Sequence, residues 1–129
     1  MIKILCFVFG LVIISSCEKT VIENPDPCEE KQYIRMFVLD TLDRPYFFKT
    51  TYTYLDDTTL ILKYEELVKP SALVVLTDDE IDKISNSINH LTVEAYDYKD
   101  SLLLVEKFKV SRDSCHIRYL EGPKSVTIQ

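Results

Sequence analysis

Cys115 and His116 are adjacent, and a thiol nucleophile and its general base require these two residue types. Three serines near this histidine, Ser111, Ser114 and Ser125, raise the second possibility of a serine nucleophile, but no Gly-x-Ser-x-Gly sequence accompanies them. Neighbours in a strand point to opposite faces, so we expect His116 to be exposed and to point away from Cys115. The sequence therefore predicts no catalytic residues and no enzyme.

A run of acidic residues could supply oxygen ligands to a hard cation. It comprises Asp78, Asp79, Glu80 and Asp82. The glycine and the alternate-residue spacing of a calcium loop are missing, and acidic residues gather at the start of a helix for electrostatic reasons alone. We therefore expect these carboxylates to begin a helix, and we predict neither a metal nor a cofactor.

The N-terminal segment has the order of a secretory signal, with a basic start, an apolar stretch and a small-residue cleavage site. Lys3 supplies the charge, Ile4 to Ile14 the apolar stretch, and two serines precede Cys17. The apolar stretch is shorter than the roughly 20 residues of a membrane-spanning helix. Residues 1–16 therefore predict a signal peptide that is removed.

The residues Ile14-Ser15-Ser16-Cys17 resemble the bacterial lipobox, which has an aliphatic residue, two small residues and an obligatory cysteine. The resemblance implies that Cys17 receives a diacylglyceryl thioether and an acylated amine, and several acyl chains such as palmitate anchor a protein stably in a bilayer. The expected location is the bacterial cell envelope, at the outer membrane. The alternative is an ordinary signal peptide, with Cys17 as the first thiol of a soluble protein.

Export would place the remaining cysteines in an oxidising compartment. Cys6 leaves with the signal peptide and Cys17 carries lipid, so Cys28 and Cys115 remain. We predict a disulfide between these two. Metal ligation by the same sulfurs is the weaker alternative, because the chain has two histidines and no Cys-x-x-Cys spacing.

Removal of residues 1–16 leaves 113 of the 129 residues, enough for one small domain. Residues 17–27 contain two prolines and no sustained periodicity, which predicts a solvated tether. The domain is expected over residues 28–129. The whole chain carries 21 acidic and 15 basic residues, a balance that repels nucleic acid.

Residues 28–129 consist mainly of short runs rich in β-branched and aromatic residues, separated by turn residues. About seven such strands favour an antiparallel sandwich. A capping box from Thr77 to Glu80, followed by isoleucines at helical spacing up to Ile88, predicts one short inserted helix that ends near Asn89. The strands are expected at Tyr33–Asp40, Tyr46–Leu55, Thr58–Tyr64, Ala72–Leu76, Leu91–Tyr96, Leu102–Val110, Cys115–Tyr119 and Ser125–Gln129.

The chain has eight tyrosines, and amphipathic rings suit the faces of sugars. Tyr52 and Tyr54, on one expected threonine-rich strand, are the candidates for such a binding surface. In a chain without tryptophan, the simpler alternative is that most tyrosines are core and strand-surface residues.

The domain resembles the carboxypeptidase regulatory-like, transthyretin-like domain of small lipoproteins from Bacteroides-type bacteria. The matching segments are Cys28, Ile34–Asp40 with Pro45, Leu91–Ala95, Tyr96–Tyr98, Leu102–Val110 and Asp113–Ile117, the last reading D-S-C-H-I. The resemblance implies an all-β, Greek-key β-sandwich, transthyretin-like or immunoglobulin-like, without a catalytic constellation. This chain departs from the family by lacking the usual turn glycines and by the helical insertion near residues 77–89.

These features favour a non-catalytic cell-envelope lipoprotein, held to the bilayer through Cys17, that presents a small β-sandwich to a protein or glycan partner. The alternative is a subunit of a surface fibre, in which a neighbouring chain adds a strand to an exposed sheet edge.

Overall fold

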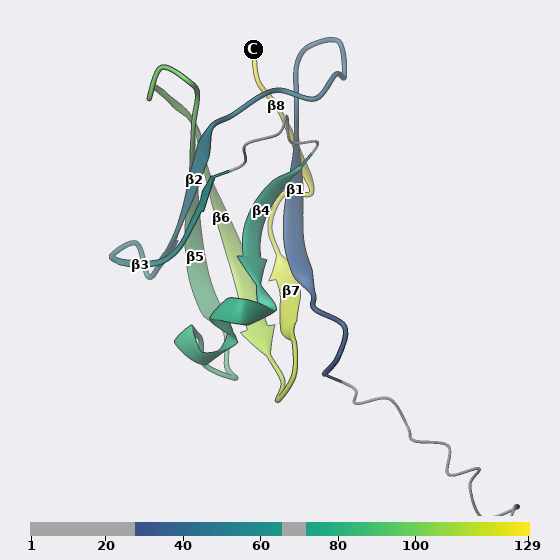
Figure 1. Ribbon diagram of the computed structural model, residues 1–129, viewed down its shortest axis with the longest axis vertical. Helices are drawn as coiled ribbons and strands as arrows, with labels where there is room; N and C mark the ends of the chain where they lie inside the picture. Colours follow the sequence, from purple (N-terminus) through teal and green to yellow (C-terminus); the bar gives the residue numbers. More distant parts are fainter. Residues whose placement is uncertain (1–27, 66–71) are drawn as a thin grey trace, which may run out of the picture.

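Residues 28–65 and 72–129 are described by the computed structural model and form two packed β-sheets (Figure 1). One sheet has three strands in the order β4-β1-β8, and the other has five in the order β3-β2-β5-β6-β7. The predicted signal peptide, Cys17 and the tether lie outside the described residues. The strands are β1 (Tyr33–Leu39), β2 (Thr50–Leu55), β3 (Thr59–Glu65), β4 (Leu73–Thr77), β5 (Asn89–Tyr96), β6 (Leu102–Arg112), β7 (Ile117–Glu121) and β8 (Ser125–Thr127).

The alternation of apolar residues positions the core between the two sheets. In β5 the side chains of Leu91, Val93 and Ala95 are buried, whereas the residues between them are partly exposed. The five residues of β4 are all buried, as its continuous apolar sequence predicts. Strands of both sheets contribute to one hydrophobic cluster, and the predicted all-β sandwich is confirmed.

Strand β8 departs from the antiparallel arrangement predicted for the whole sandwich, because it pairs with β1 in parallel. The chain leaves β7 through Gly122, which has φ +148°, and crosses to the three-stranded sheet. A Cβ at Gly122 would lie 2.4 Å from the Phe108 ring, which is buried in the core. Only glycine fits this crossing, since both the backbone angle and the close approach exclude a side chain.

The predicted helix is shorter than expected and is a 3-10 helix, η2 (Asp78–Lys83), which begins with the predicted capping box. It ends because Ile84 is extended and Asn89 already belongs to β5. The Asn89 amide bonds to the carbonyls of Ser85 and Ser87, which holds the intervening residues in a loop. Ile88, expected on the apolar helix face, is 60% exposed. None of the described residues belongs to a helix with the length and apolar character needed to span a bilayer.

Aspartates occupy turn positions whose backbone angles usually favour glycine. Asp43, Asp56, Asp57 and Asp100 all have positive φ, and a short polar side chain tolerates this backbone region better than most. The turns can therefore close without glycine, and this explains how the chain keeps its hairpins with two glycines in total.

Candidate functional site

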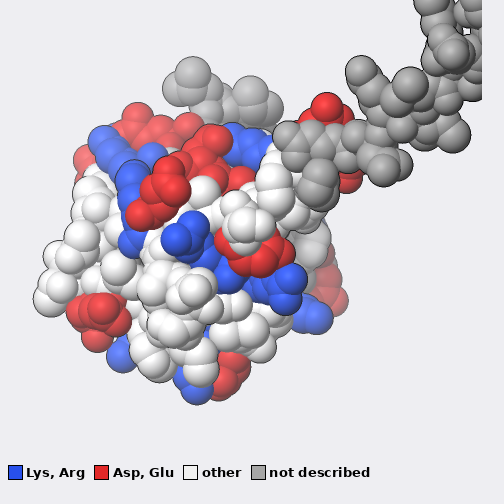
Figure 2. Space-filling view, turned by 90° about the horizontal axis from the view of Figure 1, so that it is seen from below, with Lys and Arg blue, Asp and Glu red and all other residues white. Residues whose placement is uncertain are grey.

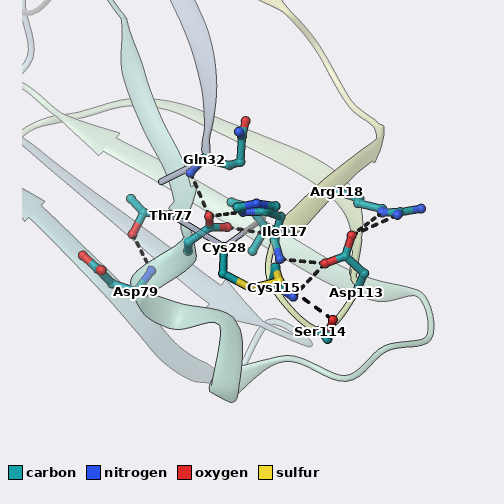
Figure 3. Close-up of polar contacts among 11 residues, drawn as sticks. Cys28, Gln32, Thr77, Asp79, Asp113, Ser114, Cys115, Ile117 and Arg118 are labelled. Atoms are coloured by element: carbon teal, nitrogen blue, oxygen red, sulfur yellow. Dashed lines mark hydrogen bonds and ion pairs between the residues drawn. A yellow bond between two sulfur atoms is a disulfide. The ribbon is translucent and has the colours of Figure 1, made fainter. Parts of the chain in front are cut away.

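The disulfide lies at the end of the sandwich where the described chain begins, in line with the prediction. Cys28 and Cys115 are bonded, with their Cα atoms 4.9 Å apart (Figure 3). Cys28 precedes β1, and Cys115 lies in the turn between β6 and β7. The bond therefore joins the first described residue to the turn that precedes β7, an edge strand of the five-stranded sheet.

Asp78, the first residue of η2, binds three groups from two other segments of the chain. Its Oδ2 accepts the Gln32 backbone N–H at 2.8 Å and lies 2.7 Å from Nδ1 of His116. Its Oδ1 accepts the N–H of Ile117 at 2.9 Å. The Asp78 carboxylate thus holds the segment before β1 and the start of β7 together.

The environment of Asp78 favours its charged form. Partial burial is the largest single effect and raises the pKa of Asp78, but the hydrogen bonds from Ile117, Gln32 and His116 together outweigh it and lower the pKa. The side chain of Asp78 is 12% exposed and that of His116 21%. His116 is therefore not the exposed histidine that strand alternation predicted.

Asp113 explains why His116 is not an exposed strand residue. Its Oδ1 accepts the N–H groups of Cys115 at 2.8 Å and His116 at 2.7 Å, so these residues form a turn and β7 begins only at Ile117. Its Oδ2 accepts from the Arg118 guanidinium at 2.9 Å. The bonds from Cys115, His116 and Arg118 lower the pKa of Asp113 to about 2.

This disulfide end has the residues of a catalytic site but not their arrangement. The contact of His116 with Asp78 resembles a base held by an orienting carboxylate. The adjacent thiol, however, is bonded to Cys28 and is no nucleophile while the disulfide persists. The geometry therefore supports a structural function for these residues.

The acidic run weighed as a cation site is divided among separate partners. Asp79 pairs with Lys31, and Glu80 accepts from the Thr77 hydroxyl at 2.7 Å within the capping box. Within residues 28–65 and 72–129, no group of three or more histidine, cysteine or acidic side chains could hold a metal ion. Figure 2 shows basic and acidic residues interspersed with uncharged surface on the end of the sandwich seen from below.

The second candidate lies on the outer face of the five-stranded sheet and comprises Tyr52, Tyr54 and Tyr96, here called the tyrosine face. Tyr52 and Tyr54 are two residues apart on β2, so both point outward. Their ring centroids are 6.4 Å apart and their planes differ by 29°. Tyr96, from the end of β5, meets Tyr52 edge to face at a centroid distance of 5.6 Å and an angle of 86°.

A hollow of about 480 Å³ opens between these rings, Thr50 and Asp100. Two carboxylates border the tyrosine face: Glu94 accepts from the Tyr96 hydroxyl at 2.8 Å, and Asp100 pairs with Lys49 at 3.2 Å. The hydrogen bond to Glu94, together with burial, raises the pKa of Tyr96. Burial, followed by the charge of Glu94, raises the pKa of Tyr54.

A second hollow, of about 420 Å³, lies near the β2–β3 turn on the same sheet. Four of its charged lining residues lie in pairs, since Lys109 contacts Glu121 at 2.9 Å and Lys107 lies 3.9 Å from Asp57. Asp56 also lines this hollow, which therefore carries a small excess of negative charge.

The sequence pointed to Tyr52 and Tyr54 but missed two residues of the same region, and it also missed the contacts of Asp78 at the disulfide end. Tyr96 and Glu94 follow from the alternation of β5, which directs every second residue away from the core. Asp78 was expected only to begin a helix, and nothing local indicated its contacts with remote segments. Comparisons with protein-family models, curated proteins and solved structures found no match for the chain.

Proposed function

We propose that this chain is a non-catalytic lipoprotein of the bacterial cell envelope that presents the tyrosine face of a small β-sandwich to a protein or glycan partner. In this proposal Cys17 carries the acyl chains, residues 17–27 form the tether, and residues 28–129 form the presented domain.

The observation that carries the proposal is the placement of the tyrosine face relative to the start of the domain. The described chain begins at Cys28, at the lower end of the sandwich in Figure 1, whereas the β5–β6 turn lies at the upper end. Tyr96 and Asp100, at and within this turn, border the hollow. A domain tethered through residues 17–27 would therefore present the hollow away from the membrane.

The disulfide end supports the same proposal. A lipid tether attaches to the domain just before Cys28, and any load on the tether would reach the bond to Cys115 before it reaches β1. The contacts of Asp78 with Gln32 and Ile117 join the same segments. An attachment point of this kind suits a protein that is anchored at its N-terminal end.

Metabolic labelling with a palmitate analogue in the native bacterium tests the anchoring. The wild-type protein is expected to carry label and to sediment with membranes, and the Cys17→Ala variant to lose the label. Cys6→Ala is the matched control, because it removes a cysteine that takes part neither in the cleavage site nor in the disulfide, and it should keep the label. An unmodified amino terminus, or one that retains Met1, would contradict the proposal.

The fibre subunit remains a second candidate because of one feature of the three-stranded sheet. Strand β8 is three residues long and pairs with β1 in parallel, so an incoming strand would need to displace few hydrogen bonds. Analytical ultracentrifugation of the unlipidated domain, lacking residues 1–17, separates the two proposals. A monomer favours the binding module, and a polymer or uptake of a donor strand favours the fibre.

A further inference from the structure

We infer that the tyrosine face binds a neutral glycan, with a sugar ring lying on Tyr52 and Tyr54 and a neighbouring part of the glycan in the hollow beside Tyr96. This inference rests on the proposed function and names the partner class of the same surface.

The ring geometry favours a flat ligand. The rings of Tyr52 and Tyr54 stack along β2, with centroids 6.4 Å apart and planes that differ by 29°. This separation leaves part of each ring uncovered by the other, and the two rings together form an aromatic platform on β2. Tyr96 stands nearly perpendicular to Tyr52 and forms a wall at one end of this platform. A sugar has an apolar face of C–H groups and a polar rim, which matches rings that are apolar in the middle and hydroxylated at the edge.

The hollow provides both the space and the polar groups that such a ligand needs. Its volume of about 480 Å³ is within the range of roughly 300–1,000 Å³ typical of small-molecule sites. Glu94 lies opposite Tyr52 in the β2–β5 register, and Asp100 lines the hollow itself. Both carboxylates can accept hydrogen bonds from sugar hydroxyls, and charge-assisted bonds of this kind are stronger than neutral ones.

The charges around the hollow disfavour an acidic glycan. Two cations near the tyrosine face are paired: Lys49 contacts Asp100 at 3.2 Å, and Lys63, whose ammonium lies 5.9 Å from the Tyr52 ring centroid, contacts Glu65 at 2.9 Å. The charge of Glu94 also raises the pKa of the neighbouring tyrosines. A carboxylated or sulfated sugar would be repelled by the charges of Glu94 and Asp100, whereas a neutral sugar would not.

A protein partner fits this surface less well than a glycan does. Protein interfaces depend on a central apolar core, and the hollow is bordered instead by hydroxyl and carboxylate groups. The exposed aliphatic side chains on the same sheet face, such as Leu60 and Val105, belong to β3 and β6 and flank the platform on opposite sides. They do not form one patch with each other, because β2 and β5 lie between them.

Full-length lipidated protein, purified in detergent, should be tested on immobilised neutral oligosaccharides of glucose, mannose, xylose and galactose, with oligogalacturonate as the acidic comparison. We expect at least one neutral oligosaccharide to bind and oligogalacturonate not to bind. Titration calorimetry should then show at least a tenfold weaker affinity for Tyr52→Ala and for Tyr54→Ala. Tyr52→Phe keeps the ring and should retain most of the affinity, which separates stacking from misfolding. Tyr33→Ala, on the other sheet, is the matched control and should bind as the wild type does.

Absence of binding to every neutral oligosaccharide would overturn the inference, as would binding that survives Tyr52→Ala and Tyr54→Ala or that prefers oligogalacturonate. A photo-crosslinking residue at Leu60, which pairs with Tyr54 and is 49% exposed, distinguishes this failure from failure of the proposed function. Crosslinking to one envelope protein that is lost in Tyr54→Ala, without glycan binding, would overturn the glycan inference and leave the envelope module standing. Failure of the proposed function itself is detected separately, by the absence of a palmitate label on Cys17.

Discussion

Removing the disulfide with Cys28→Ala and Cys115→Ala is expected to cost the domain a large part of its stability. The two cysteines are 87 residues apart, and a bond across a loop of this length lowers the entropy of the unfolded chain. The loop-entropy relation gives about 4.6 kcal/mol for this span. Domains of this size are usually stable by about 5–15 kcal/mol, so the double variant should be marginal.

Urea unfolding followed by far-ultraviolet circular dichroism measures this loss. For a slope of about 1–3 kcal/mol per molar urea, the loss corresponds to a midpoint lower by roughly 1.5–4.5 M. Hydrogen exchange should be faster in residues 28–32, which would then be held mainly by the contacts of Gln32 with Asp78 and of Lys31 with Asp79. Ser114→Ala, next to the disulfide, is the control and should change the stability by less than about 0.5 kcal/mol.

A double variant that unfolds within about 1 kcal/mol of the wild type would refute this reasoning. In that case the unfolded chain would already be restricted without the bond, and the loop-entropy relation would not apply to this protein. An unchanged rate of exchange in residues 28–32 would refute the local part of the argument on its own.

Three further predictions concern the interior and the disulfide end. The pKa values of Asp78 and Asp113 lie below the unfolded value of about 3.9, so the stability that these carboxylates contribute is complete above that pH and is lost as the pH falls through their folded pKa values, about 2 for Asp113. Urea midpoints between pH 5 and 2 should therefore fall less steeply in a variant with both residues changed to asparagine. A slope identical to that of the wild type would contradict this. Thr53→Val removes a buried hydroxyl that donates to a β4 carbonyl at 2.6 Å and should destabilise the domain by about 1–3 kcal/mol. Thr51→Val removes a buried hydroxyl without a partner among the described residues and should be neutral or stabilising. Equal effects of the two variants in thermal unfolding would show that the hydrogen bond of Thr53 is unimportant. Gly122→Ala should lower stability by about 2–4 kcal/mol, because a methyl group there strains the backbone and enters the space of the Phe108 ring. A melting temperature equal to that of the wild type would exclude this clash.

The strands and the faces they bury could be predicted from sequence because the signal is local. In β1 the side chains of Ile34, Met36 and Val38 are buried as their alternation predicts, and the capping box at Thr77 is present. The length of the helix after this box was predicted wrongly. Helical spacing of isoleucines extends to Ile88, but the bonds of Asn89 and its pairing in β5 prevail over this pattern.

The disulfide was predictable for a different reason, since Cys28 and Cys115 are the pair that remains if Cys6 leaves with a signal peptide and Cys17 carries lipid. The tyrosine face was predictable only in part. Tyr52 and Tyr54 share a strand, but Tyr96 joins them through the pairing of β2 with β5, in which Thr50 lies opposite Tyr96. The contact of Asp78 with His116, 38 residues away, likewise depends on where β7 begins.

The amino-acid sequence alone was sufficient to predict the cysteine pair, the class of fold and the inward face of most strands. These properties depend on composition and on residues within a few positions of one another. The grouping of Tyr96 and Glu94 with the β2 tyrosines, the parallel pairing of β8 and the contacts of Asp78 required the folded chain. The alternation of apolar and polar residues along a strand defines which face each residue occupies. This alternation is the same when a strand slides by two residues along its neighbour, so it does not define the register. Register, and with it every contact between remote strands, is therefore set by the packing of the two sheets and the closure of the turns.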